Sequence, residues 1–227
     1  MSLTLNRPEK LNAIDNDLAE AVLETIEGAA KDAAVRALRV CGNGRAFCAG
    51  RDVTEAPTER DLTLVQAVAA SLVRLDKPVL FAVHGWTVGA GLEWMLDADV
   101  VVAASGSRFK LPEASLGVFV TGGLSATLPA YAGLSRAKAL TLLGDEFTAE
   151  QACAWGLVWQ VVDLADLEAV SVQLAKRLAA LEPAVASHFK RVFNEVGLAG
   201  FDRAIHLENE AQRFLGAAAN TSKRDDA

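Results

Sequence analysis

The sequence has few of the residues that build disulfide frameworks, nucleic-acid surfaces or membrane spans. Only three of its 227 residues are cysteines, and Cys41, Cys48 and Cys153 are too scattered to suggest a disulfide framework or a metal site. The formal net charge is −7, which disfavours a broad nucleic-acid surface. The most apolar stretch, Pro78 to Ala104, is interrupted by one histidine and three acids, so we expect no membrane span.

Signals for secretion and for nucleotide binding are also missing. The opening residues, Met-Ser-Leu-Thr-Leu-Asn-Arg-Pro, lack the apolar run of a secretory signal, and we expect reduced thiols in the cytoplasm. No G-x-G-x-x-G motif opens the first βα unit, and no P-loop lysine follows a glycine-rich loop. An anionic small molecule stays possible, because it needs only a local basic group or a helix N-terminus.

The hydrophobic fraction of 52% and the low count of six prolines indicate a well-packed globular protein. Apolar runs predict strands over residues 3–5, 35–41, 79–83, 99–103, 108–111 and 157–162. Helix starts are expected at Asp17–Glu20, at Thr58, near Gly89 and at Thr148–Gln151, and 84–88 is expected to be a loop. Further helices are expected over residues 122–131, 135–143, 166–181, 184–196 and 201–215. Because strands alternate with helices only up to about residue 163, we predict an α/β fold with largely parallel strands, followed by helices.

Two glutamates and two glycine-bearing segments carry the candidate chemistry. Glu93 ends Gly-Ala-Gly-Leu-Glu (89–93), Glu113 ends Leu-Pro-Glu (111–113), and Ala-Phe-Cys-Ala-Gly-Arg-Asp spans residues 46–52. Each glycine-bearing segment lies where a strand should lead into a helix, and such junctions expose backbone N–H groups that nothing in the chain satisfies. Donors of this kind, together with two carboxylates, can hold an oxyanion and move protons.

Each candidate also has a simpler structural interpretation. Glu93 has apolar neighbours, so it is either buried with a raised pKa or exposed on a helix face. Glu113 could cap a short helix, and the glycines could serve only tight turns or close packing. Cys48 is better explained as a small buried residue than as a nucleophile. His84 could orient a backbone segment, whereas the other two histidines lie in late helices and suggest packing or surface roles.

The combination of motifs resembles the crotonase, or enoyl-CoA hydratase/isomerase, superfamily. The segments that carry the resemblance are Leu-Asn-Arg-Pro-Glu-Lys-Leu-Asn-Ala (5–13), the 46–52 segment, Lys-Pro-Val-Leu-Phe-Ala-Val-His-Gly (77–85), Val-Gly-Ala-Gly-Leu-Glu (88–93), Leu-Pro-Glu-Ala-Ser-Leu-Gly (111–117) and Ala-Trp-Gly-Leu-Val (154–158). The resemblance covers nearly the whole chain. It implies a spiral of ββα units over residues 1–163 and a helical trimerisation region over 164–227, shorter than usual.

The resemblance also assigns roles to particular residues. The N–H groups of Arg51 and Ala90 would hold the thioester oxygen, Glu93 would activate a water, and Glu113 would exchange the proton at C2. Substrate contacts would come from neighbours in the same loops: Ala49, Gly50, Asp52, Gly89, Gly91 and Gly122. The implied reaction is hydration of a 2-enoyl-CoA. An enoyl-CoA Δ3–Δ2 isomerase, a hydrolase or decarboxylase, and a non-catalytic acyl-CoA-binding protein remain open.

Further expectations concern ligands and assembly. The resemblance implies coenzyme A as part of the substrate and not as a bound cofactor, with no metal ion. It also implies a homotrimer or a hexamer built as a dimer of trimers. Two apolar stripes in the late helices, Leu174-Leu178-Leu181 and Phe189-Val192-Phe193, are explained first by core packing and second by a trimer interface.

Overall fold

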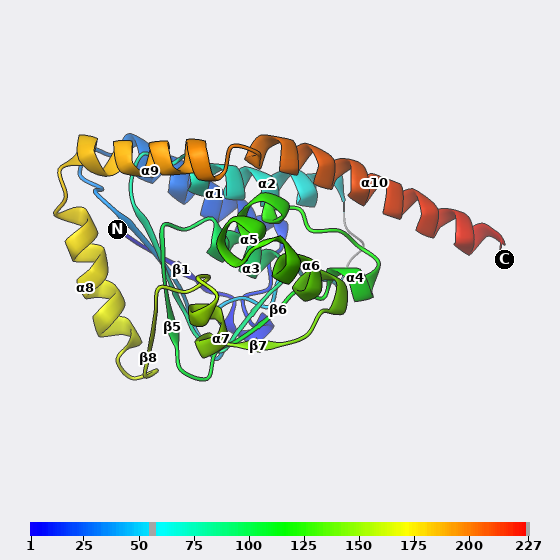
Figure 1. Ribbon diagram of the computed structural model, residues 1–227, viewed down its shortest axis with the longest axis horizontal. Coiled ribbons are helices and arrows are strands. Elements are labelled where there is room, and N and C mark those ends of the chain that lie inside the picture. The colour runs from blue at the N-terminus through cyan, green and yellow to red at the C-terminus, as the bar shows by residue number, and fades with distance from the viewer. Residues whose placement is uncertain (55–57, 226–227) are drawn as a thin grey trace.

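Two β-sheets lie at the centre of the protein, and the computed structural model describes residues 1–54 and 58–225 (Figure 1). The strands are β1 (Ser2–Leu5), β2 (Leu38–Gly42), β3 (Val79–Val83), β4 (Trp86–Val88), β5 (Val100–Ala104), β6 (Arg108–Lys110), β7 (Phe147–Thr148) and β8 (Gln160–Val162). The larger sheet has the order β1-β2-β3-β5-β8, and all its neighbouring strands are parallel. The smaller sheet has the order β4-β6-β7, with one parallel and one antiparallel pair.

Helices surround these sheets. They are η1 (Pro8–Lys10), α1 (Asn16–Lys31), α2 (Glu59–Arg74), α3 (Ala90–Leu96), α4 (Glu113–Leu116), α5 (Leu124–Ala132), α6 (Leu134–Leu143), α7 (Ala149–Ala154), α8 (Leu167–Ala179), α9 (Pro183–Gly197) and α10 (Phe201–Asp225). Helices α9 and α10 follow one another along one side, and the end of α10 extends beyond the rest of the molecule (Figure 1). The predicted α/β fold, with parallel strands followed by a helical region, is confirmed. In the part of the chain that is described, no helix combines the length and apolarity needed to cross a membrane.

Strand β3 explains why helices cover both faces of the larger sheet. All five of its residues are buried apolar side chains. Val79, Phe81 and Val83 face the main core, whereas Leu80 and Ala82 face a second, smaller core that α8 covers. Because successive side chains of a strand point to opposite faces, a strand that is apolar throughout requires apolar cover on both sides.

Capping patterns placed two helices correctly and one incorrectly. The Thr58–Asp61 and Thr148–Gln151 capping boxes are both formed. The expected start at Asp17 is wrong, because the carboxylate of Asp15 accepts the N–H of Leu18 at 2.8 Å and so begins α1 at the next residue. An N-cap needs only one side chain that reaches a free N–H of the first turn, and Asp15 does so two residues earlier.

Some expected strand boundaries and one expected loop also differ from the structure. The strand predicted over 35–41 begins at Leu38, where pairing with β3 starts. The predicted loop over 84–88 is wrong, since Trp86–Val88 forms β4 and pairs with β6 in parallel register. Three residues are too few to show an alternating pattern, so no local signal predicts this strand. It forms because β6, about twenty residues later in the sequence, pairs with it.

The two apolar stripes of the late helices have different surroundings. Leu174 and Leu178 of α8 pack against the second core, as the core-packing interpretation predicts, whereas Leu181, beyond the end of α8, is 45% exposed. In α9 that interpretation is wrong, because Phe189, Val192 and Phe193 are 64%, 51% and 70% exposed. Helix α9 is held to the core by a cation instead: the ammonium group of Lys190 lies 2.9 Å from a carboxylate oxygen of Asp99 and is buried.

Candidate active site

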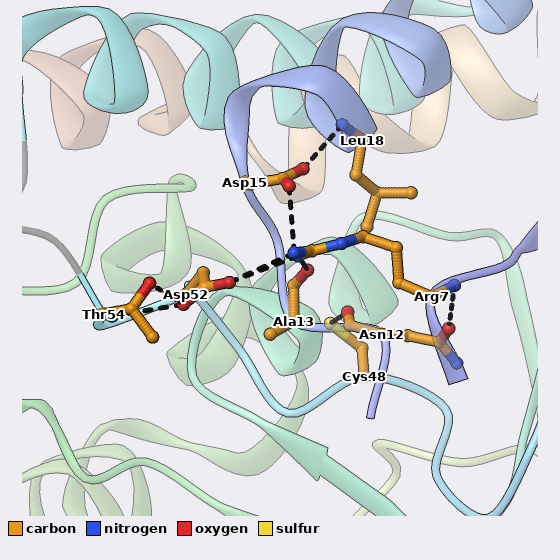
Figure 2. A network of polar contacts seen from close by, with 8 residues as sticks. All are labelled: Arg7, Asn12, Ala13, Asp15, Leu18, Cys48, Asp52 and Thr54. Atoms are coloured by element: carbon orange, nitrogen blue, oxygen red, sulfur yellow. Dashed lines mark hydrogen bonds and ion pairs between the residues drawn. The ribbon is translucent and has the colours of Figure 1, made fainter. Parts of the chain in front are cut away.

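A polar network near the N-terminus fixes the loop that carries residues 46–54 (Figure 2). The side-chain amide of Asn12 donates to the carbonyl oxygens of Ala46 at 2.9 Å and Phe47 at 3.1 Å. The guanidinium of Arg7 donates to the carbonyl of Ala13 at 2.6 Å and pairs with Asp52 at 3.3 Å. Asn12 is fully buried, and satisfied donors of this kind hold a loop without any regular strand ladder.

One parallel bridge leaves the backbone N–H of Arg51 unengaged. Ile14 donates to the carbonyl of Gly50 and accepts from the N–H of Asp52, each at 2.8 Å. In such a bridge the residue between these two positions turns its own N–H away from the partner strand. The N–H of Arg51 has no acceptor among the described residues, while its guanidinium pairs with Asp61 at 3.1 Å.

A second parallel bridge aligns Arg51 with Ala90. Cys48 donates to the carbonyl of Trp86 at 3.1 Å and accepts from the N–H of Val88 at 3.0 Å, so Cys48 pairs with Thr87. Arg51 and Ala90 each lie three residues beyond this bridged pair, so the bridge brings together the two segments that carry them.

Ala90 is the first residue of α3, a position whose N–H has no acceptor within the helix. Within the described ranges nothing else accepts it. Arg51 and Ala90 both line one cavity of about 410 Å³. Two residues whose N–H groups have no described partner therefore come from two loops to line the same cavity.

The same cavity is lined by most of the site residues that were predicted from the sequence. Eight of the ten line it: Ala49, Gly50, Arg51, Asp52, Gly89, Ala90, Glu93 and Glu113. Gly91 and Gly122 do not. A Cβ on Gly91 would lie 2.7 Å from Sγ of Cys48, and one on Gly122 would lie 2.7 Å from a carboxylate oxygen of Glu93. These two glycines permit close packing behind the site.

Glu93 is held deep in this cavity by backbone donors. It lies one turn into α3, is 2% exposed, and accepts the N–H of Thr121 at 3.0 Å and the N–H of Gly122 through the same oxygen. Its pKa is raised well above the usual range, first by burial and then by the negative charges of Glu113 and Glu208. The two N–H donors oppose that rise because they stabilise the charged form.

Glu113 reaches the cavity from the first turn of α4. Burial raises the pKa of Glu113 to about 7. One of its oxygens, Oε2, is buried and has no hydrogen-bond partner in the described part of the chain. A carboxyl of this kind exchanges protons near neutral pH and has a free oxygen with which to do so.

Sequence reasoning missed several lining residues: Val53, Thr54, Val88, Pro112, Leu116, Val118, Phe119, Thr121 and Gln212. Gln212 comes from α10, about a hundred residues beyond Glu113 in the sequence, and its oxygen accepts the N–H of Phe119 at 2.6 Å. No local pattern distinguishes this glutamine from other polar residues of an amphipathic helix. Cys48 is the buried residue that the sequence suggested, and burial raises the pKa of its thiol to about 12.

The arrangement joins the two parts needed for chemistry on a carbonyl compound. Unengaged N–H groups stabilise an oxygen that becomes negatively charged, most strongly where water is excluded. Two carboxyls with raised pKa values accept and release protons beside it. The described residues contain no group of three or more histidine, cysteine or acidic side chains placed to hold a metal ion.

Comparison with known proteins gives a consistent result. The family model described as enoyl-CoA hydratase/isomerase matches residues 1–222. The chain is 36% identical to the 1,2-epoxyphenylacetyl-CoA isomerase of Escherichia coli (strain K12), covering 97% of this chain and 88% of that protein. It is 35% identical to the 2,3-dehydroadipyl-CoA hydratase of the same organism, covering 95% and 86%.

Solved structures agree with the sequence relatives. An enoyl-CoA hydratase from Mycobacterium avium subsp. paratuberculosis K-10 matches with a TM-score of 0.89 at 29% identity, covering 94% of this chain and 85% of that one. The likeness extends over almost the whole chain, so the crotonase fold predicted from the sequence is confirmed.

The buried carboxyl of Glu113 should make stability depend on pH. Its pKa is raised from 4.5 to about 7 on folding, so its contribution is fully present below pH 4.5 and is lost as the pH rises through 7. Replacing it by glutamine removes this loss. Between about pH 5 and pH 8, we expect the Glu113→Gln variant to gain about 2–3 kcal/mol in free energy of unfolding relative to the wild type.

Urea denaturation at the two pH values measures this difference. The exposed Glu146 provides the control, since Glu146→Gln should follow the wild type at both pH values. A Glu113→Gln variant that tracks the wild type across the same range would show that this carboxyl has its ordinary proton affinity.

Proposed function

The chain belongs to the enoyl-CoA hydratase/isomerase family, and we propose that it is a hydratase that adds water across the double bond of a 2-enoyl-CoA thioester. One observation carries the proposal: two unengaged N–H groups and two carboxyls of raised pKa line the same cavity. Hydration of a conjugated thioester requires both parts, because negative charge develops on the thioester oxygen while protons move at two carbons.

The N–H groups of Arg51 and Ala90 would bind the thioester oxygen. When water attacks C3, the double-bond electrons move toward the carbonyl and give an enolate oxyanion. Donors that are fixed before the reaction stabilise this charge without further reorganisation. The network of Arg7, Asn12 and Asp52 supports this role, since it holds the loop that presents the N–H of Arg51.

The two carboxyls would divide the proton transfers. Ionised Glu93 takes a proton from water as the oxygen bonds to C3, and protonated Glu113 delivers a proton to C2. Mutual repulsion of two close acids favours a state with one proton between them, which supplies one base and one acid. Water adds to an existing double bond with no change in electron count, so the proposed reaction needs no redox cofactor. Coenzyme A enters as part of the substrate.

An enoyl-CoA Δ3–Δ2 isomerase is the second candidate. The observation that favours it is the unpartnered Oε2 of Glu113 on a carboxyl whose pKa is raised to about 7. One such group can remove a proton at C2 of a 3-enoyl-CoA and return it at C4, with the enolate held by the same N–H pair. Two of the relatives, at 36% and 29% identity, are themselves named isomerases.

Substitution of each glutamate separates the two reactions. We expect Glu93→Gln and Glu113→Gln each to lower kcat on crotonyl-CoA by about 10²–10⁴, because each removes one proton-transfer group. For an isomerase, Glu113→Gln alone should abolish conversion of a 3-enoyl-CoA. The conjugated thioester absorbance follows both reactions, without added metal or cofactor.

The same assay decides the remaining readings. A wild-type protein that binds CoA thioesters without turning any over would be an acyl-CoA-binding protein. Release of free thiol would identify a hydrolase, and loss of carbon dioxide from a carboxyacyl-CoA a decarboxylase. Unchanged hydration in Glu93→Gln would contradict the two-carboxyl mechanism.

The oxyanion contact of Ala90 can be removed without losing the helix. Proline lacks the N–H and is tolerated at the first position of a helix, where Ala90 lies. We expect Ala90→Pro to lower kcat by about 10²–10³, the usual loss for one such donor. Ala90→Gly keeps the N–H and is the control. Circular dichroism confirms folding, and equal kcat values for the two variants would remove Ala90 from the proposed site.

We further propose assembly as a homotrimer, or as a hexamer of two trimers. Support comes from the apolar face of α9, whose members are 48% to 78% exposed: Val185, Phe189, Val192, Phe193 and Val196. Beside it lies a cavity of about 1070 Å³ with a largely apolar lining that includes Phe189, Phe193 and the 71% exposed Trp159. Apolar patches of this kind are uncommon on monomers.

A charge on this face should prevent assembly. We expect Phe193→Glu to sediment as a monomer in analytical ultracentrifugation, because an unpaired carboxylate would be buried between copies. Leu142→Glu, which alters a 72% exposed leucine of α6 away from this cavity, should leave the assembly intact. A wild-type protein that sediments as a monomer at assay concentration would refute the proposed trimer.

We also propose a cytoplasmic location. The three cysteines, Cys41, Cys48 and Cys153, are all free thiols, as a reducing compartment favours. Fractionation of the native cells tests this, and recovery of the protein outside the cytoplasm would contradict it.

A further inference from the structure

One buried carboxylate outside the cavity lining contacts the segment that holds Glu93. Glu208 of α10 has no exposed surface. One of its oxygens accepts the N–H of Gly123 at 2.8 Å, and the other accepts the N–H of Ser125 at 2.8 Å and its hydroxyl at 2.6 Å. Three donors thus converge on a side chain that lies more than eighty residues away in the sequence.

These donors belong to the start of α5, which lacks a cap of its own. Gly123 is the N-cap residue and has no side chain to offer the first turn. Glu208 supplies the missing acceptor from another helix, and a negative group at a helix N-terminus is favourable. The contact is therefore a cap provided across the fold.

Consecutive peptide groups connect this cap to Glu93. The N–H of Gly122 donates to Glu93, and the N–H of the next residue, Gly123, donates to Glu208. Thr121 donates to the same oxygen of Glu93 at 3.0 Å. The segment of residues 121–123 therefore donates to Glu93 on one side and to Glu208 on the other. A movement of the Glu208 carboxylate is transmitted to Glu93 through two peptide units.

Helix α10 holds this segment at two further points. The oxygen of Gln212 accepts the N–H of Phe119 at 2.6 Å. The ring of Phe201 lies against Gly123, where an added Cβ would come within 2.3 Å of it. The segment from 119 to 125 is thus attached to α10 along its length, and it also lines the cavity through Phe119 and Thr121.

We propose that Glu208 is a positioning residue for Glu93, acting through the peptide groups of residues 121–123. It fixes the two N–H donors that orient the Glu93 carboxylate, and its negative charge makes that carboxylate harder to ionise. The inference rests on the proposed function only in treating Glu93 as the base. Glu208 itself does not line the cavity and makes no contact with substrate in this proposal.

The charge effect has a definite sign. Among the described residues, the charged groups that act on Glu93 are Glu113 from α4 and Glu208 from α10. Asp97, the residue that follows α3, is repelled by the charges of both Glu93 and Glu208. Lys190 acts on Asp97 with the opposite sign. Removing the charge of Glu208 leaves Glu93 with less repulsion, so its pKa should fall and the rising limb of the kcat profile should move to lower pH.

Two variants of Glu208 separate its effect on the position of Glu93 from the effect of its negative charge. Glu208→Gln keeps the shape but loses the charge, and it presents an NH₂ group either to the N–H of Gly123 or to the two donors of Ser125. We expect kcat to fall about 10- to 100-fold with KM nearly unchanged, because the base is misplaced. The rising limb should move down by roughly half a pH unit or more. Glu208→Asp keeps the charge but is one methylene shorter, so kcat should fall while the limb stays in place.

The control is Glu210, an exposed glutamate of the same helix two residues beyond Glu208, whose carboxylate lies 3.4 Å from the imidazole of His206. Glu210→Gln should leave both kcat and the limb unchanged. All measurements are made below the unfolding transition of each variant, monitored by circular dichroism. A Glu208→Gln variant that unfolds at lower temperature yet keeps wild-type kcat and limb would show a purely structural cap and overturn the proposal.

A measurement without turnover keeps this proposal separate from the proposed function. Carbon-13 NMR of the glutamate carboxyl carbons follows the titration of Glu93, assigned by its absence in Glu93→Gln. We expect the titration midpoint of Glu93 to move to lower pH in Glu208→Gln and to keep its wild-type value in Glu208→Asp. If no CoA thioester is turned over, the proposed function fails, but the titration of Glu93 still tests the role of Glu208. A Glu93 midpoint that is unchanged in Glu208→Gln would overturn the inference.

Discussion

Backbone register is the constraint on which the site depends. Two N–H groups can donate to the same oxygen only if they lie close together and neither already has an acceptor. The bridge between Cys48 and Thr87 brings together the segments that carry Arg51 and Ala90, and the bridge between Ile14 and Arg51 directs the Arg51 N–H away from its neighbouring segment. A shift of one residue in either bridge would turn a different peptide group toward the cavity. The buried amide of Asn12 and the absence of a side chain at Gly91 both serve to fix this register.

Around these donors lie several buried acidic side chains that cannot all be ionised at once. Glu93 and Asp97 are both buried with pKa values raised well above the usual range, and in each case burial is the largest cause. Neither oxygen of Asp97 has a hydrogen-bond partner among the described residues, and Lys190 is the cation that acts on it. The N–H groups of Thr121 and Gly122 replace water as donors to Glu93, and those of Gly123 and Ser125 do the same for Glu208. The proton affinity of Glu93 therefore depends on burial and Glu113, and also on segments that line or support the site without supplying a carboxyl to the cavity.

Local sequence patterns predicted the parts of the structure that short segments determine. The capping boxes at Thr58 and Thr148 and the apolar run of β3 follow from immediate neighbours in the sequence. For Glu93 the apolar neighbours left burial and exposure open, and the structure shows that it is buried. The resemblance supplied the pairing of Arg51 with Ala90, which no local pattern could give. What stayed hidden depends on distant contacts: β4 forms because β6 pairs with it, and Glu208 and Gln212 look like ordinary polar residues of a helix. For the apolar face of α9 the sequence favours core packing over a trimer interface, because periodicity alone does not say what covers a helix.

The arrangement of free oxygens bears on which reaction the cavity supports. Isomerisation needs one carboxyl that reaches two carbons, whereas hydration needs two carboxyls acting on water and on C2. Both backbone bonds to Glu93 go to Oε2, and no described residue contacts Oε1 by a hydrogen bond. Glu113 likewise keeps Oε2 without a partner. Each acid thus has one oxygen available for substrate or water. A site that used only Glu113 would have no need to keep Glu93 oriented by two peptide groups, so this geometry favours the two-carboxyl reaction.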